Sequence, residues 1–195
     1  MSGCHQSVTH AKHTAMRIIE LYPSRRNIWP LIVPGKVVVE VGVFKGDNAR
    51  DILIHEPAHL YMVDIFAGLA ASGDENGENR EAVNLGYVYR HLTREMASKP
   101  VTLVRGASPM VLADIDRPVD VVYIDGGHLY QQVRDDLHGA LKLVGDRPGS
   151  IIGGHDYSMR TPGVIKAVTE FCKEERLHLW AMTTGPIPSY FIRIE

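Results

Sequence analysis

One stretch near the start of the chain, residues 37–47, constrains the fold more than any other. Four valines flank Glu40, and two glycines, Gly42 and Gly46, follow directly. A buried parallel strand has such a near-continuous apolar run, and glycines after it let a ligand approach the backbone closely. Asp47 then opens a helical pattern, whose first N–H groups lack partners within the helix. The stretch therefore predicts a strand, a turn and a helix, with a ligand bound at the turn.

The rest of the chain repeats this alternation of strands and helices. Helices are expected at residues 9–22 and 47–54, around Val133 to Val144, and from Pro162 onward. The expected strands are 36–41, 60–63, 101–104, 119–124, 150–152, 179–183 and 190–194. Such alternation predicts a mostly parallel sheet covered by helices. The last two strands have no helix between them, so they are expected to be antiparallel. We therefore predict a single α/β domain over residues 1–195, with a helical extension at 1–35.

Composition excludes several classes of partner. The 195 residues are 45% hydrophobic, and 21 basic against 23 acidic side chains give a net charge of -2. A nucleic-acid partner would need a clustered basic face, and a membrane span would need about 20 consecutive apolar residues. Cys4 and Cys172 lie far apart and indicate no disulfide framework. We expect no nucleic-acid or membrane partner, and a cytoplasmic location, because a reducing compartment is the default for such a chain.

Two segments leave alternatives open. Cys4, His5, His10 and His13 form either a metal-binding cluster or an ordinary chain end. The polar, glycine-rich residues 67–79 form either a surface loop or a lid, because they directly follow the end of a strand.

Polar residues gather where the predicted strands end. In an open α/β sheet, ligands bind outside the carboxyl ends of the strands. The groups expected at that edge are Glu40 with the Gly42–Gly46 turn, Asp64, Gly106 with Ala107 and Ser108, Asp125 with Gly126, Gly127 and His128, and finally His155 with Asp156.

The first two strand ends suit a nucleoside. Asp64 follows Glu40 by 24 residues, the approximate spacing at which a carboxylate accepts hydrogen bonds from both ribose hydroxyls. The turn has neither the dinucleotide nor the phosphate-loop glycine pattern, and Asp47 would repel a pyrophosphate. The pattern therefore favours a positively charged nucleoside without phosphates, the alternative being a plain tight turn.

The later strand ends suit metal and acid–base chemistry. Two carboxylates and an imidazole, from Asp125, His155 and Asp156, can bind a divalent cation, although Mg²⁺ prefers oxygen ligands. The alternative is that His155 and Asp156 only order the loop that follows. His128 is a candidate general base, since imidazole titrates near neutral pH, or it is structural.

Together, these motifs resemble a class I S-adenosylmethionine-dependent methyltransferase. The motifs are Val39–Gly46, Val63-Asp64, Tyr123-Ile124-Asp125-Gly126-Gly127-His128-Leu129-Tyr130, and Gly154-His155-Asp156-Tyr157 followed by Pro162-Gly163-Val164. The chain is most similar to the small family of macrocin O-methyltransferase, and more distantly to catechol O-methyltransferase. This resemblance implies a Rossmann-like seven-stranded, mostly parallel sheet with helices on both faces and an antiparallel last strand. Residues 36–195 would be the cofactor-binding core.

The resemblance also implies an activity and its ligands. We expect O-methylation of a small-molecule hydroxyl by S-adenosylmethionine, assisted by Mg²⁺ or another divalent cation. Glu40 and the Gly42–Gly46 turn would hold the methionine part, Asp64 the ribose, and Gly106 to Ser108 the region of the adenine. The full set expected at the cofactor is Glu40, Gly42, Val43, Phe44, Gly46, Asp47, Asp64, Ile65, Gly106, Ala107, Ser108, Asp125 and Gly126.

The catalytic residues are expected to be Asp125 and His128, and the metal ligands Asp125, His155 and Asp156. Relatives often carry an acidic residue where this chain has Gly127, so His128 or a metal-acidified substrate must replace it here. Two alternatives remain: a metal-independent methyltransferase with His128 as base, and a non-catalytic S-adenosylmethionine-binding protein. A homo-oligomer is also left open.

Overall fold

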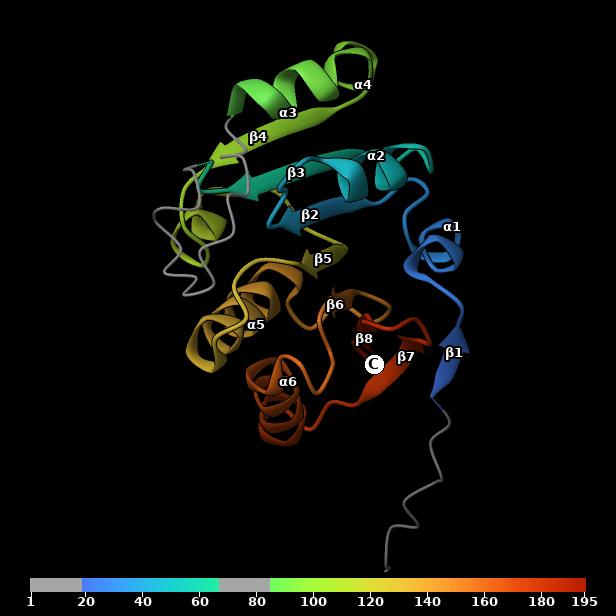
Figure 1. The fold of residues 1–195 in the computed structure, drawn as a ribbon, viewed down its shortest axis with the longest axis vertical. Helices are drawn as coiled ribbons and strands as arrows, with labels where there is room; N and C mark the ends of the chain where they lie inside the picture. The colour runs from blue at the N-terminus through green and yellow to red at the C-terminus, as the bar shows by residue number, and fades with distance from the viewer. Residues whose placement is uncertain (1–18, 67–84) are drawn as a thin grey trace, which may run out of the picture.

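A computed structural model describes residues 19–66 and 85–195 of the chain (Figure 1). Its centre is an eight-stranded sheet in the order β1-β7-β8-β6-β5-β2-β3-β4. The strands are β1 (Glu20–Tyr22), β2 (Val37–Val41), β3 (His59–Asp64), β4 (Val101–Arg105), β5 (Val121–Ile124), β6 (Ile151–Gly154), β7 (Leu179–Thr183) and β8 (Tyr190–Arg193).

Strand directions follow the predicted pattern. Every neighbouring pair is parallel except the two that involve β8, which runs antiparallel to β6 and to β7. The α/β fold with a mostly parallel sheet and an antiparallel last strand is therefore confirmed, with eight strands instead of seven.

The additional strand, β1, corrects the prediction of a helix at residues 9–22. Glu20–Tyr22 pairs in parallel with β7, placing Glu20 opposite Ala181 and Tyr22 opposite Thr183. The helix was predicted from apolar spacing, but at these three residues the free edge of β7 provides backbone hydrogen-bond partners that spacing alone cannot reveal. Residues 9–18 of that predicted helix lie outside the described residues.

The rest of the predicted helical extension is short. A 3₁₀ turn, η1 (Arg25–Asn27), leads into α1 (Trp29–Ile32), and both lie between β1 and β2. Trp29 is fully buried, with its ring 4.9 Å from that of Tyr123 and 5.8 Å from that of Phe191. This aromatic contact fixes the segment against the sheet. Residues 67–79 and the cluster of Cys4, His5, His10 and His13 lie outside the described residues.

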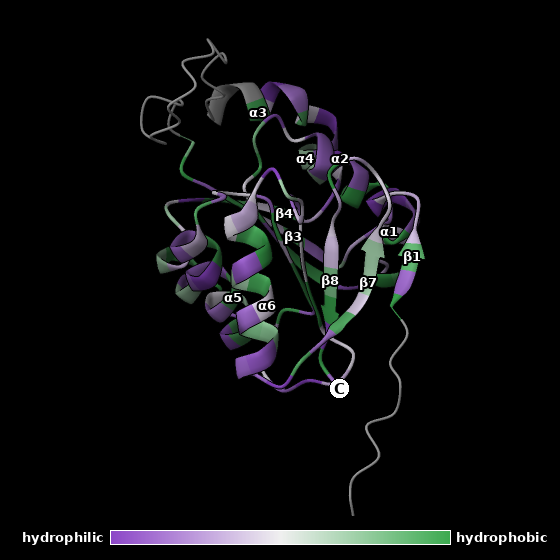
Figure 2. Ribbon diagram, turned by 60° about the horizontal axis from the view of Figure 1, so that its bottom comes forward, coloured by the Kyte–Doolittle hydropathy of each residue, from purple (hydrophilic) through white to green (hydrophobic). Residues whose placement is uncertain are grey.

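Helices cover both faces of the sheet. They are α2 (Asp47–Leu53), α3 (Leu85–His91), α4 (Thr93–Ser98), α5 (Tyr130–Val144) and α6 (Pro162–Glu174), with a 3₁₀ turn, η3 (Met110–Asp114), after β4. Figure 2 shows α5 and α6 side by side, with hydrophobic and hydrophilic bands alternating along them. Residues on their apolar sides pack against one face of the sheet, whereas α1, α2 and the end of α3 pack against the other.

Alternate residues of each strand supply the two cores. Val39 and Val41 belong to the core beneath α5 and α6, whereas Val38 belongs to the core beneath α1 and α2. This division follows from the two-residue period of a strand. In the described ranges, no helix combines the length and the apolar character needed to cross a bilayer. The site lies at the carboxyl edge, where β2, β3, β5 and β6 end in register.

Candidate functional site

The glycine turn after β2 lies directly against the end of β5. Gly42 has a φ of 86°, which favours glycine, and a Cβ there would lie 2.5 Å from the carbonyl carbon of Asp125 and 2.7 Å from Cα of Gly126. Any other residue would therefore push the two strand ends apart. Phe44, at the tip of the turn, has a φ of 48° and is 50% exposed. The tip of the predicted turn, at Phe44, is thus exposed to solvent, whereas its start, at Gly42, packs closely against the end of β5.

Glu40 is fully buried at the end of β2. Its Oε1 accepts a hydrogen bond of 2.9 Å from Nδ2 of Asn48, on α2. Its Oε2 and the Oδ1 of Asn48 are buried without a hydrogen-bond partner among the described residues. Burial raises the pKa of Glu40 to about 8, against the opposing effect of the Asn48 hydrogen bond. Two buried polar atoms therefore lack a hydrogen-bond partner, and a positive charge placed beside Glu40 would favour its ionised form.

Asp64, at the end of β3, holds the glycine turn in place. Its Oδ2 accepts hydrogen bonds from the backbone amides of Val43 (2.8 Å) and Phe44 (3.2 Å). Its Oδ1 accepts one from the amide of Phe66, at 2.8 Å. Each carboxylate oxygen can accept more than one hydrogen bond, so the Asp64 carboxylate can still bind a hydroxyl group. The structure therefore brings Asp64 to the same turn as Gly42, as the sequence predicted.

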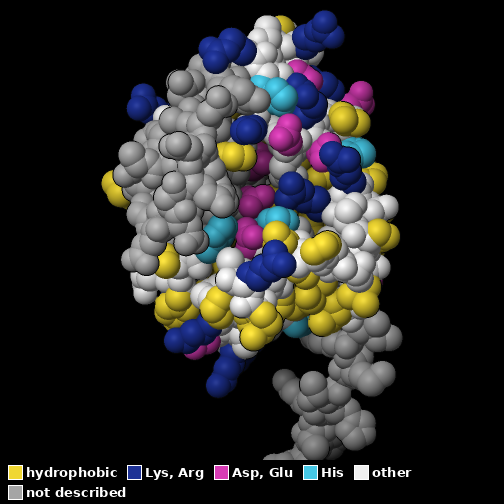
Figure 3. All heavy atoms as spheres, in the orientation of Figure 1, with side chains coloured by type: hydrophobic (Ala, Val, Ile, Leu, Met, Phe, Trp, Pro, Cys, Tyr) yellow, Lys and Arg dark blue, Asp and Glu magenta, His cyan; other side chains and the backbone are white. Residues whose placement is uncertain are grey.

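The predicted metal ligands also come together. Ligand atoms of Asp125, His155 and Asp156 all lie within 4.8 Å of one another. Nδ1 of His155 is 3.6 Å from Oδ1 of Asp125 and 3.3 Å from Oδ2 of Asp156. The three residues line a small pocket together with His128 and Tyr190. Figure 3 shows Asp, Glu and His side chains gathered in the middle of one face of the molecule.

Electrostatics differ between the two carboxylates of this cluster. Burial raises the pKa of Asp125, against the favourable charges of His155 and Arg25. Burial also acts to raise the pKa of Asp156, but hydrogen bonds with His128 and His155 prevail and hold it well below its usual range. Nε2 of His128 is 2.9 Å from Oδ2 of Asp156. His128 and Asp156 therefore form a hydrogen-bonded imidazole–carboxylate pair, which is an arrangement suited to proton transfer.

Arg25 is a site residue that the sequence did not reveal. Its NH1 donates to Oδ2 of Asp125 and to the hydroxyl of Tyr123, both at 3.2 Å. Arg25 precedes the first predicted strand, in a segment expected to be helical and without a motif. No sequence signal could have placed it at the site, because its position depends on β1 pairing with β7.

The remaining predicted cofactor residues divide into two groups. The backbone amide of Gly106 donates to the carbonyl of Asp64 at 3.0 Å. This hydrogen bond brings the loop of Gly106, Ala107 and Ser108 beside the end of β3. Ile65, which follows β3, is partly exposed. Asp47 is mostly exposed, and its Oδ1 lies 3.1 Å from Nε2 of His91, on α3. Asp47 thus pairs with a side chain of α3.

Comparison with known proteins identifies a family for the chain. Residues 39–157 match the family model described as a methyltransferase domain. No curated protein matched the chain.

Solved structures match the fold at low sequence identity. A putative rRNA methylase from Clostridium thermocellum is 19% identical, with a TM-score of 0.64 over 87% of this chain and 93% of the other. An O-methyltransferase from Bacillus cereus, solved in complex with SAH, is 17% identical, with a TM-score of 0.63 over 88% and 81% of the two chains. An O-methyltransferase of tomaymycin synthesis from Streptomyces achromogenes, in complex with SAM, is 14% identical, with a TM-score of 0.62 over 87% and 78%.

Proposed function

The chain belongs to the family of methyltransferase domains, and from that premise we propose that it transfers a methyl group from S-adenosylmethionine to a hydroxyl group of a small molecule. Asp125, His155 and Asp156 would hold a divalent cation, which would assist the transfer by acidifying the acceptor hydroxyl. Membership in the smaller family of macrocin O-methyltransferase is part of the same proposal. The observation that carries it is the convergence of Glu40, Asp64 and the three candidate metal ligands at one edge of the sheet.

The cofactor is supported by the groups around the glycine turn. S-adenosylmethionine carries an α-ammonium as well as its sulfonium, and the unpartnered Oε2 of Glu40 can accept a hydrogen bond from the ammonium directly or through water. Asp64 supplies a carboxylate at the turn for the ribose hydroxyls. The turn itself offers no phosphate site, because Asp47 begins α2 with a negative charge.

The cation is supported by the donor set. Two carboxylates and one imidazole within 4.8 Å fit a divalent ion. Mg²⁺ is the ion first expected, but an imidazole ligand also suits Mn²⁺ or Zn²⁺. When bound, the cation would lower the pKa of the acceptor hydroxyl and orient it.

The chain's own residues position the reactants and receive the proton. The Gly42 turn and Asp64 fix the cofactor, so that the acceptor hydroxyl approaches the methyl carbon opposite the sulfur. The new bond joins the hydroxyl oxygen to the methyl carbon as the carbon–sulfur bond breaks, giving a methyl ether and a neutral thioether. His128, whose Nε2 lies 2.9 Å from Oδ2 of Asp156, is the side chain that receives the hydroxyl proton.

Exposed apolar side chains at the same edge support a small organic acceptor. Phe44 is 50% exposed, Leu129 67% and Met159 85%, each in a loop that follows a parallel strand. Such side chains suit an acceptor with an apolar body.

Cation binding and activity together test this proposal. Wild-type protein, Asp125→Asn and Asp156→Asn are titrated with Mn²⁺, and methyl transfer to a panel of hydroxyl compounds is followed by release of S-adenosylhomocysteine. Asp135→Asn is the matched control, since Asp135 is an exposed residue of α5. We expect both site variants, but not the control, to lose Mn²⁺ binding and at least about 90% of the cation-dependent transfer.

Three outcomes would argue against parts of the proposal. Full transfer in EDTA by either site variant would reject the cation and favour a metal-independent enzyme with His128 as base. Tight cofactor binding without transfer to any compound of the panel would favour a non-catalytic binding protein. Transfer to RNA but to no small molecule would reject the acceptor class.

A further inference from the structure

Arg25 is held at the site from outside the core of the fold. It lies in η1, between β1 and α1. On one side β1 pairs with β7, and on the other Trp29 is buried against Tyr123. Within the turn, Ser24 donates its backbone amide (3.2 Å) and its hydroxyl (2.9 Å) to Oδ1 of Asn27. The backbone of Arg25 is therefore fixed at both ends, and its side chain reaches the strand ends from a defined point.

The guanidinium lies over the ends of the two central strands. NH1 donates to Asp125 and to the hydroxyl of Tyr123, and Cζ lies 5.8 Å from the centre of the Tyr123 ring. The Arg25 charge also favours the ionised form of Glu40, on the neighbouring strand. The side chain is 26% exposed. Its Nε and second amino group donate to no partner among the described residues.

The guanidinium of Arg25 is a positive charge among the carboxylates of this edge of the sheet. The carboxylates there, which belong to Glu40, Asp64 and Asp125, suit the positive groups of the proposed cofactor. None of them suits its α-carboxylate, which needs a cation or backbone amides when removed from water. A guanidinium with unused, parallel donors binds a carboxylate through two hydrogen bonds.

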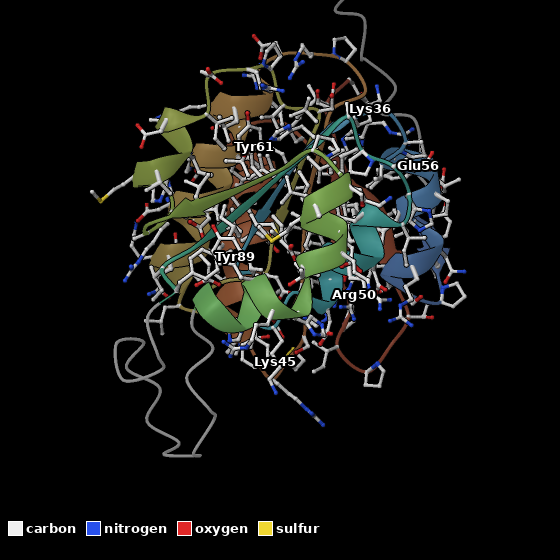
Figure 4. The ribbon with its side chains drawn as sticks, turned by 90° about the horizontal axis from the view of Figure 1, so that it is seen from above. Lys36, Lys45, Arg50, Glu56, Tyr61 and Tyr89 are labelled. Carbon is white, nitrogen blue, oxygen red and sulfur yellow. The ribbon has the colours of Figure 1, made fainter. Side chains whose placement is uncertain are left out.

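Other basic side chains near the turn are engaged elsewhere. Lys45 lies with its Nζ 5.5 Å from the centre of the Phe44 ring. Nε of Arg50 donates to Glu95 at 3.1 Å, and NH2 donates to the carbonyl of His91. Figure 4 shows Arg50 near α2 and the helix pair α3 and α4, which agrees with these contacts. Both side chains therefore contact groups other than Glu40 and Asp125.

We propose that Arg25 binds the α-carboxylate of the cofactor's methionine group while NH1 remains on Asp125. This inference rests on the proposed function, since it assumes S-adenosylmethionine as the cofactor. Arg25 thereby links the N-terminal segment to cofactor recognition and places the α-ammonium on the side of Glu40. A carboxylate on the acceptor is the other source of the same chemistry, and the experiment separates the two.

The test compares three ligands by isothermal titration calorimetry. S-adenosylhomocysteine carries the α-carboxylate, its decarboxylated analogue lacks only that group, and methylthioadenosine lacks the whole amino-acid tail. The variants are Arg25→Met, which keeps an unbranched side chain on Tyr123, and Arg26→Met as the matched control. Arg26 is the next residue in η1, is 73% exposed, and pairs with Asp51 at 2.7 Å.

Arg25→Met should lower the affinity for S-adenosylhomocysteine roughly 10- to 100-fold, because a charge-assisted hydrogen-bonded pair is lost. It should leave methylthioadenosine and the decarboxylated analogue within about twofold of wild type. Arg26→Met should bind all three ligands as wild type does. Unchanged methylthioadenosine affinity also shows that Arg25→Met is folded.

Two results would overturn the inference. If Arg25→Met binds S-adenosylhomocysteine with unchanged affinity, the inference is rejected. If the KM for the acceptor rises in that variant, Arg25 instead binds a carboxylate of the acceptor. Equal weakening of all three ligands also rejects it, because the role of Arg25 is then structural. If wild-type protein binds none of the three ligands, the proposed function itself fails, which is a distinct result.

Discussion

The buried Glu40 should make the stability of the protein depend on pH in a predictable direction. Its side chain has no exposed surface, and burial raises its pKa from the ordinary 4.5 to about 8. Ionising Glu40 in the folded protein therefore costs about 5 kcal/mol more than ionising it in the unfolded chain. The substitution Glu40→Gln removes this titration and retains an oxygen that can accept the Asn48 hydrogen bond.

The sign follows from proton counting. Between pH 4.5 and 8 the unfolded chain loses the Glu40 proton while the folded protein keeps it. The stabilisation from protonated Glu40 is thus complete below pH 4.5 and is lost as the pH rises towards 8. The free energy of unfolding of wild type should therefore fall between pH 5 and pH 8 by roughly 3 kcal/mol more than that of Glu40→Gln.

Urea unfolding of both proteins at pH 5, 6, 7 and 8 measures this difference. Glu56→Gln is the control, because Glu56 is exposed and labelled on the surface in Figure 4. Saturating S-adenosylhomocysteine should reduce the pH dependence of wild type, since its ammonium would let Glu40 ionise. If the difference in unfolding free energy between Glu40→Gln and wild type stays constant from pH 5 to pH 8, Glu40 does not have a raised pKa in the folded protein.

Two further predictions concern the turn and the base. Gly42→Ala should destabilise the protein by roughly 2–5 kcal/mol in urea unfolding, because its Cβ meets the Asp125 backbone at a positive φ; Gly35→Ala, also at a positive φ but with open space, should cost about 1 kcal/mol. Comparable losses in the two variants would contradict the role of that contact. His128→Asn should lower kcat at least about tenfold and leave S-adenosylhomocysteine affinity unchanged; wild-type kcat would exclude His128 as the base.

Much of the fold was readable in the sequence because its strands are apolar runs that end in glycines or acidic residues. The valines before Gly42 and the residues before Asp125 could form buried parallel strands and little else. The order of the strand ends predicts that Asp64, Asp125 and Asp156 lie at one edge. The geometry of the sheet converts this order into proximity, since neighbouring parallel strands end side by side.

What the sequence could not show depended on contacts between distant segments. Strand β1 exists because β7 offers a free edge some 160 residues later in the chain, and three residues are too few for a periodic signal. Arg25 reaches Asp125 only because that pairing, and the burial of Trp29, fix the N-terminal segment. The pairing of His128 with Asp156 likewise required the loops after β5 and β6 to be placed.

Calorimetric titration of the full chain with S-adenosylhomocysteine, with NAD as the comparison ligand, measures whether this edge of the sheet is the cofactor site. We predict one-to-one binding of S-adenosylhomocysteine, weakened at least about tenfold by Asp64→Asn, because a hydrogen bond to a charged carboxylate is lost. We predict no binding of NAD. Binding of NAD without binding of S-adenosylhomocysteine, or an Asp64→Asn affinity equal to that of wild type, would contradict the assignment of this edge as the cofactor site.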